Sequence, residues 1–153
     1  MKGLTVKAKS SLAAMIALIL AGCATMPADD APLPTELHDA RAVYAEDCKP
    51  DAPVFARDLI LRADLNGDGR DDYVVNAAAY QCRGDTPYCG SAGCETQIFM
   101  SAPGGVLEQR FSGHVQEPPR IVRRNGKPAL VSGAGRSAEM FDSRSLRYAP
   151  APP

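Results

Sequence analysis

Apolar and polar residues alternate in short runs along most of the chain, and one stretch follows a helical spacing instead. Leu37, Ala40 and Tyr44 recur at intervals of three to four residues in a segment that ends before Pro50. Apolar residues at this spacing line one face of an α-helix. The pattern therefore predicts an amphipathic helix over residues 35–47.

After this segment, apolar runs of four to eight residues alternate with clusters of Gly, Pro, Asn and Asp, which is typical of strands and turns. The dipeptide Asn125-Gly126 predicts a tight hairpin, because a type I′ turn needs positive φ at both central residues. Short connections of this kind make neighbouring strands antiparallel. The sequence predicts an α+β fold, mainly β, with one N-terminal helix packed on an antiparallel meander sheet. The expected strands lie near residues 56–63, 73–80, 95–101, 106–111, 119–124, 128–132 and 145–148.

The first 22 residues have the features of a secretory signal peptide. Lys2, Lys7 and Lys9 precede an apolar run at 12–21. A run of about ten residues is too short to span a bilayer, which needs about 20. A basic segment followed by such a run is typical of an export signal.

The residues Leu20-Ala21-Gly22-Cys23 resemble the bacterial lipobox. The resemblance implies that Cys23 is acylated and becomes the first residue of the mature chain. Two or more acyl chains hold a protein firmly on a membrane. Ala24 follows in place of the aspartate that favours inner-membrane retention, so the resemblance implies the outer membrane, facing the periplasm. The alternative is an ordinary signal peptide with a chance cysteine.

The rest of the chain divides into a linker at 23–34, one β-rich domain at 35–148 and a disordered tail at 149–153. Loss of the signal removes three basic residues and leaves 14 basic against 18 acidic, a net charge of −4. Nucleic-acid-binding proteins usually carry a basic surface. We therefore expect no nucleic-acid partner, but a membrane contact through the anchor and an unidentified protein or envelope partner.

Four cysteines remain after Cys23, and an even number in an exported chain implies two disulfides. They are Cys48, Cys82, Cys89 and Cys94. Three connectivities are open. We favour Cys89–Cys94, which closes a small loop, with Cys48–Cys82 joining the end of the helix to the end of a strand. A thiolate zinc site would need closely spaced ligand pairs such as C-x-x-C, which the chain lacks.

The acidic stretch DLNGDGRDD, residues 64–72, carries the pattern most suggestive of a bound ligand. Side-chain oxygens fall at positions one, three, five and nine, and a glycine at position six permits a sharp turn. Calcium requires six to eight oxygen ligands. The alternative is that Asn-Gly and Asp-Gly form tight turns whose aspartates only interact with water. The candidate calcium ligands are Asp64, Asn66, Asp68, the main-chain carbonyl of Arg70, and Asp72.

The segment ADLNGDGRDDYVV resembles the calcium loop of FG-GAP and VCBS repeats, which lies between two strands of a propeller blade. The likeness covers about residues 58–111, and it implies a structural calcium ion held by the ligands named above. A single copy implies no propeller. An EF-hand is excluded because its position twelve, a bidentate glutamate, is Val75 here. The whole is also similar to small exported proteobacterial proteins with a C…CG-x-x-GC segment.

No catalytic residues stand out, so we expect a non-enzymatic binding or envelope-support module. The alternative is a small periplasmic hydrolase or inhibitor-like protein that uses His114 with a carboxylate as a base. The only other histidine, His38, lies beside Asp39 on the predicted helix, where a solvated side chain is expected.

Overall fold

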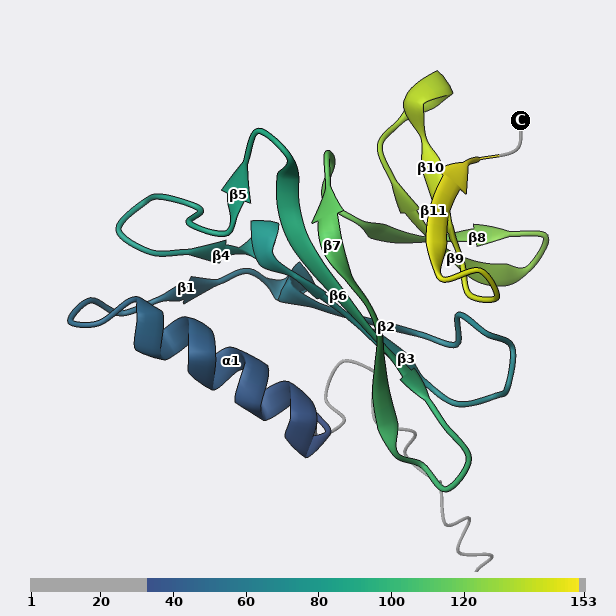
Figure 1. Cartoon of the computed structure of the whole chain (residues 1–153), viewed down its shortest axis with the longest axis horizontal. Helices are drawn as coiled ribbons and strands as arrows, with labels where there is room; N and C mark the ends of the chain where they lie inside the picture. Colours follow the sequence, from purple (N-terminus) through teal and green to yellow (C-terminus); the bar gives the residue numbers. More distant parts are fainter. Residues whose placement is uncertain (1–32, 152–153) are drawn as a thin grey trace, which may run out of the picture. The chain divides into compact units, whose positions relative to one another are not determined.

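The computed structural model describes residues 33–151, which belong to a compact unit that begins at Leu33. The predicted signal peptide, Cys23 and nearly all of the linker lie outside these residues. One α-helix precedes a series of antiparallel strands (Figure 1). This confirms the predicted class. Within the described part, no helix is long and apolar enough to cross a membrane.

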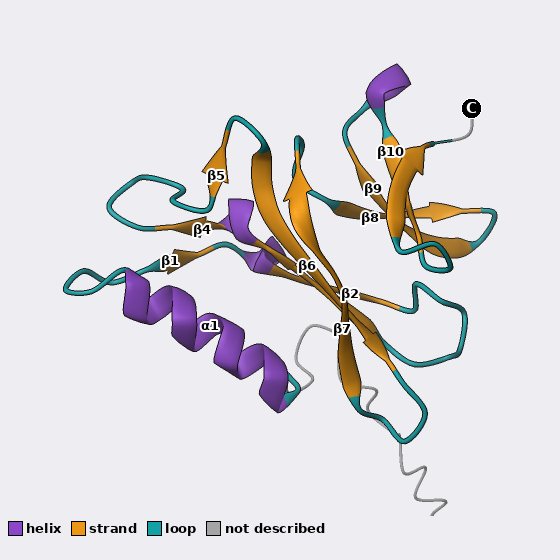
Figure 2. Ribbon diagram, viewed as in Figure 1, coloured by secondary structure: helices purple, strands orange, loops and turns teal. Residues whose placement is uncertain are grey.

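Helix α1 spans Thr35–Asp47, as predicted. Figure 2 shows that strands make up most of the remaining regular secondary structure. The strands are β1 (Val54–Phe55), β2 (Ile60–Ala63), β3 (Asp72–Asn76), β4 (Tyr80–Gln81), β5 (Cys89–Gly90), β6 (Gly93–Ser101), β7 (Leu107–Val115), β8 (Arg120–Arg124), β9 (Lys127–Ser132), β10 (Glu139–Asp142) and β11 (Arg147–Pro150). Three 3-10 turns accompany them, η2 (Arg57–Leu59), η3 (Ala77–Ala79) and η4 (Gly135–Ser137).

Several strand boundaries differ from the prediction. The expected strands at 56–63 and 73–80 are each interrupted by a 3-10 turn. At the second interruption the Asn76 side chain accepts a hydrogen bond from the Ala78 amide, and such local bonds compete with a strand ladder. Strands β1, β5 and β10 were not predicted. Strand β11 runs to Pro150, so residues 149 and 150, which the sequence assigned to a disordered tail, belong to a strand.

The strands are divided among three antiparallel sheets, where the sequence predicted one meander. Strands β1 and β4 form a pair, β2-β3-β6-β5 form a larger sheet in which β7 also pairs with β6, and β11-β10-β9-β8 form a four-stranded meander. In the meander, the predicted hairpin is confirmed. Asn125 and Gly126 have φ of 51° and 77°, and Arg124 pairs with Lys127.

Strand β3 lies between two hydrophobic cores and is buried along its whole length. On one face, Tyr73 and Val75 join a cluster with Leu37 of α1. On the other face, Val74 joins a cluster with Leu130 of the four-stranded sheet. Successive side chains of a strand point to opposite faces, so the five-stranded sheet is covered by the helix on one side and by the second sheet on the other (Figure 1).

Candidate functional site

The acidic stretch forms the loop of the β2–β3 hairpin. Ala63 pairs with Asp72, and the residues between them make the turn. Gly67 and Gly69 have φ of 82° and 81°. Residues with side chains rarely adopt positive φ, so both glycines serve the turn as the sequence predicted.

The side chains at the start of the loop fold back over its own backbone. Asp64 accepts hydrogen bonds from the amides of Gly67 at 2.6 Å, Asp68 at 3.1 Å and Gly69 at 3.0 Å. Asn66 accepts one from the Asp68 amide at 2.8 Å. These bonds are the kind by which Asp and Asn side chains stabilise tight turns. These polar side chains therefore organise the loop, while Asn66 and Asp68 stay exposed to water.

Asp72 differs from the other loop residues because its side chain is fully buried. One carboxylate oxygen accepts from the amides of Leu65 at 2.8 Å and Asn66 at 3.2 Å. The other accepts from the amide and the hydroxyl of Ser101, at 2.8 and 3.2 Å. All four donors are neutral. Burial raises the pKa of Asp72, and these hydrogen bonds oppose the rise.

Ser101, at the end of β6, is part of the site and was missed from the sequence. Its hydroxyl lies 3.2 Å from an oxygen of Asp68 and 3.2 Å from an oxygen of Asp72. It therefore joins the hairpin loop to the neighbouring strand. No spacing pattern connects Ser101 to the acidic stretch, and the only sequence signal is a hydroxyl group at the end of an apolar strand.

Arg70 holds Asp68 from the outer side of the loop. Its guanidinium donates to the Asp68 carboxylate at 2.8 Å, and its amide donates to the same carboxylate at 2.9 Å. This side-chain bond is the largest cause of the lowered pKa of Asp68. Both side chains are exposed, so the pair is a surface ion pair.

The chemistry of these oxygens fits calcium, a hard cation that prefers carboxylate, amide and carbonyl ligands. In the structure, the side-chain oxygens of Asp64, Asn66, Asp68 and Asp72 accept hydrogen bonds from N–H groups. In the part of the chain that the structure describes, no three His, Cys, Asp or Glu side chains are grouped so that they could hold a metal ion. Calcium binding at Asp64, Asn66, Asp68, Arg70 and Asp72 therefore remains a prediction, and it requires Arg70 to release Asp68.

His114 lies on β7, directly opposite Glu95 on β6, and its side chain is exposed. Glu95 accepts a hydrogen bond from Gln97 at 2.7 Å. Two cavities lie elsewhere. One of about 270 Å³ includes Asn76 in its lining, and one of about 400 Å³ lies beside Cys82. Neither is lined by His114. His38 is exposed on α1.

Both disulfides favoured from the sequence are present. Cys48 bonds to Cys82 and so joins the end of α1 to the residue after β4, while Cys89 bonds to Cys94 within the β5–β6 hairpin. The first bridge crosses a sequence separation of 34 residues and the second only 5. The long bridge therefore ties the helix to the sheet, and the short one reinforces a local turn.

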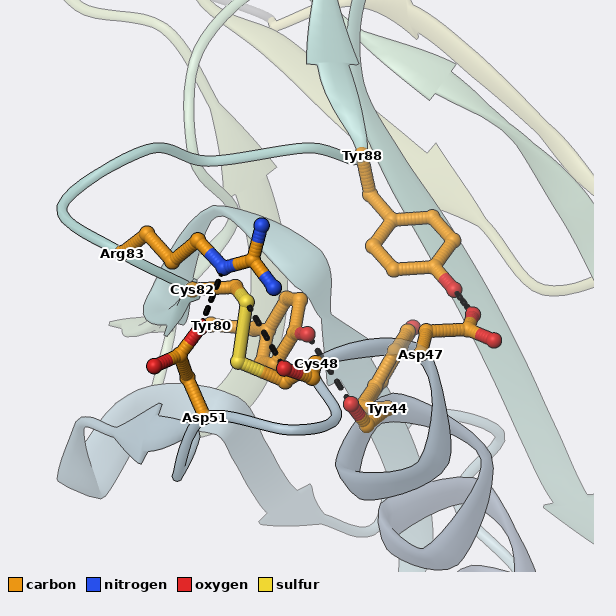
Figure 3. The surroundings of a disulfide bond; sticks show 8 residues. All are labelled: Tyr44, Asp47, Cys48, Asp51, Tyr80, Cys82, Arg83 and Tyr88. Atoms are coloured by element: carbon orange, nitrogen blue, oxygen red, sulfur yellow. Dashed lines mark hydrogen bonds and ion pairs between the residues drawn. A yellow bond between two sulfur atoms is a disulfide. The ribbon is translucent and has the colours of Figure 1, made fainter.

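Three tyrosines surround the long disulfide (Figure 3). The rings of Tyr44 and Tyr80 stack with centroids 5.0 Å apart, and the Tyr80 hydroxyl donates to the Tyr44 carbonyl at 2.9 Å. The Tyr88 hydroxyl donates to the carboxylate of Asp47. Burial raises the pKa of Tyr44 to about 12. These tyrosines stay protonated at neutral pH, so they act as packing and hydrogen-bonding groups.

The fold and the loop together define a small β-rich domain with two disulfides and an acidic hairpin. No protein family, curated protein or solved structure matches the chain.

Proposed function

We propose that this chain is a lipid-anchored protein of the bacterial cell envelope. Its β-rich domain is a non-enzymatic binding or envelope-support module. The LAGC sequence ending at Cys23 supports the anchor. The proposed location is the outer membrane, with the domain in the periplasm. A structural calcium ion at the acidic hairpin loop stabilises the domain.

The observation that carries the calcium proposal is the buried carboxylate of Asp72. A buried charge is costly unless it is paired, and the four donors to this one are neutral. A divalent cation beside Asp72 offsets that cost. Asp64, Asn66 and Asp68 lie within the same turn and supply further oxygens. The calcium loop that the sequence resembles uses the same positions.

The ion pair between Arg70 and Asp68 is a weak competitor. Exposed ion pairs contribute little to stability because solvent screens them, so releasing this one costs little. Calcium at ten times its Kd adds about 1.4 kcal/mol to the free energy of unfolding. Modules outside the cytoplasm commonly bind calcium with a Kd of about 10⁻⁴–10⁻³ M, so modest affinity is sufficient for a structural role.

A hydrolase that uses His114 is the alternative. Its supporting observation is the pairing of His114 with Glu95, because directly opposed side chains on antiparallel strands are neighbours. This alternative has less support because His114 is exposed and is not among the residues that line either cavity. A general base works best where a substrate can be enclosed beside it.

The calcium proposal is tested by thermal unfolding with calcium and with a chelator. We expect calcium to raise the Tm of the natural chain by about 5 °C, from about 1.4 kcal/mol in a domain of this size. The double substitution Asp64→Ala with Asp68→Ala should abolish the rise. Its matched control is Asp39→Ala with Asp85→Ala, which removes two exposed carboxylates outside the loop. A natural chain whose Tm ignores calcium would refute the proposal.

A further inference from the structure

Charge is segregated along the domain, although the net charge is small. Residues 33–117 contain seven basic and fourteen acidic residues, a net charge of −7. Residues 118–153 contain seven basic and two acidic residues, a net charge of +5. The second region includes the whole four-stranded sheet. The mildly acidic total therefore conceals a basic sheet.

The basic residues of the two regions also differ in their partners. In the first region, five of them form ion pairs with carboxylates, namely Lys49, Arg62, Arg70, Arg83 and Arg110. In the second region, Arg120, Lys127 and Arg147 are exposed, and none forms an ion pair with another described residue. Their charge is therefore available to a partner.

Strand alternation places these three residues on the outer face of the sheet. Ile121, Leu130 and Tyr148 belong to the core cluster that faces the five-stranded sheet. Side chains one or three positions away along the same strand point the other way. Arg120, Lys127 and Arg147 consequently point away from the core. We call this side of the four-stranded sheet, defined by these three residues, the basic face.

Apolar side chains lie between the basic residues. The register places Arg120 beside Val131, Val131 beside Met140, and Met140 beside Ala149, in one row across the four strands. Val131 is buried, Met140 is half-buried and Ala149 is exposed, so the last two are the apolar residues at the surface of this row. Asp142, which pairs with Arg147, is the acidic residue of β10 on this side. A surface that combines basic and apolar groups suits the boundary between lipid headgroups and acyl chains.

We propose that the basic face binds the surface of an anionic phospholipid membrane. The inference extends the proposed function by naming the surface against which the anchored domain rests. Phosphate groups provide negative charge for Arg120, Lys127 and Arg147, none of which forms an ion pair with another described residue. Met140 and Ala149 contact the outermost part of the acyl region.

The proposed anchor allows this contact. Ten Cα–Cα steps separate Cys23 from Leu33, and a chain of this length spans at most about 35 Å. A domain of about 120 residues has a radius of gyration of about 14 Å. The basic face can thus reach the membrane that holds the acyl chains. Acidic groups farther away than about 10 Å are largely screened at 0.1 M salt, so the nearer basic groups dominate.

The test uses the unacylated chain from Ala24 to Pro153, which contains the whole compact unit with both cores. Its result does not depend on acylation of Cys23, and a chelator removes any dependence on calcium. Co-sedimentation compares vesicles of neutral phosphatidylcholine with vesicles containing phosphatidylglycerol. Each basic residue near an anionic surface contributes about fivefold to binding. The triple substitution Arg120→Gln, Lys127→Gln and Arg147→Gln should therefore weaken binding to the anionic vesicles about a hundredfold.

The control variant carries Lys49→Gln, Arg57→Gln and Arg110→Gln. It changes the net charge by the same amount but alters only exposed residues outside the four-stranded sheet. We expect its binding to stay within a few-fold of the natural chain, and salt to weaken the binding of both. Tm measurements check that each variant is folded.

Three results would overturn the inference. The first is equal binding of the natural chain to neutral and anionic vesicles, or no binding to either. The second is an equal loss in both triple variants, which would make net charge the cause. The third is lipid-independent self-association that the first triple variant abolishes, because the basic face would then bind the acidic region of a second copy.

Discussion

The two disulfides should contribute unequally to stability, because they close loops of very different length. The Cys48–Cys82 bridge joins residues 34 positions apart, and the Cys89–Cys94 bridge joins residues 5 apart. The comparison uses two double variants, Cys48→Ala with Cys82→Ala and Cys89→Ala with Cys94→Ala. Each removes two sulfur atoms and leaves the other bridge intact.

The expected loss follows from the chain entropy that each bridge removes from the unfolded state. For a separation of 34 residues, the loop-closure relation gives about 3.8 kcal/mol, and for 5 residues about 2.1 kcal/mol. The long bridge should therefore matter more by about 1.7 kcal/mol. Burial acts in the same direction, because Cys48 is fully buried and neither Cys89 nor Cys94 is.

The assay is urea unfolding of the natural chain and both variants under non-reducing conditions. The free energy of unfolding is extrapolated to water, and the m-value is compared among the three proteins. Non-reducing peptide mapping of the natural chain first confirms the two pairings. An equal loss in both variants, or a larger loss for the short bridge, would contradict the loop-length argument. It would show that the paired hairpin around Cys89 depends on its bridge more than the separation indicates.

Two other substitutions test the site and the anchor. Asp72→Asn should lower the free energy of unfolding by about 1–3 kcal/mol, because its amide group would face N–H donors. Burial raises the pKa of Asp72, so the natural chain loses stability as the pH rises from the pKa of the unfolded chain through this raised pKa. The deficit of the variant in urea unfolding should therefore be larger at acidic pH than at neutral pH, and a deficit that does not change with pH would contradict this reasoning. Cys23→Ser should release the protein from membranes in cell fractionation, and an unchanged membrane fraction would count against acylation.

Much of the fold could be predicted because its signals are local. The helical spacing of Leu37 and Tyr44 identified α1, and Asn125-Gly126 identified the β8–β9 hairpin. The division into three sheets could not be predicted in this way. It depends on which strands meet across long separations, such as Val54 beside Gln81. Two-residue strands are too short to produce a period.

The candidate site shows the same limit. The candidate calcium ligands from Asp64 to Asp72 could be recognised because they all lie within one short stretch of the sequence. Ser101 could not, because the pairing of β3 with β6 brings it to Asp72 from 29 residues away. Total charge was also a poor guide to the surface. It averages an acidic region, residues 33–117, with a basic one, residues 118–153, and the structure adds that the basic region contains one whole sheet.

Asp72 links the acidic loop to the strands that contribute to both hydrophobic cores. It is the first residue of β3, the strand whose two faces contribute to both hydrophobic cores. Its carboxylate also holds the loop through Leu65 and the end of β6 through Ser101. A cation that relieved the burial cost of this carboxylate would tighten the β2–β3 turn and the β3–β6 pairing together. The stabilisation would then reach both cores, which is why a single loop can act as a brace for a domain of this size.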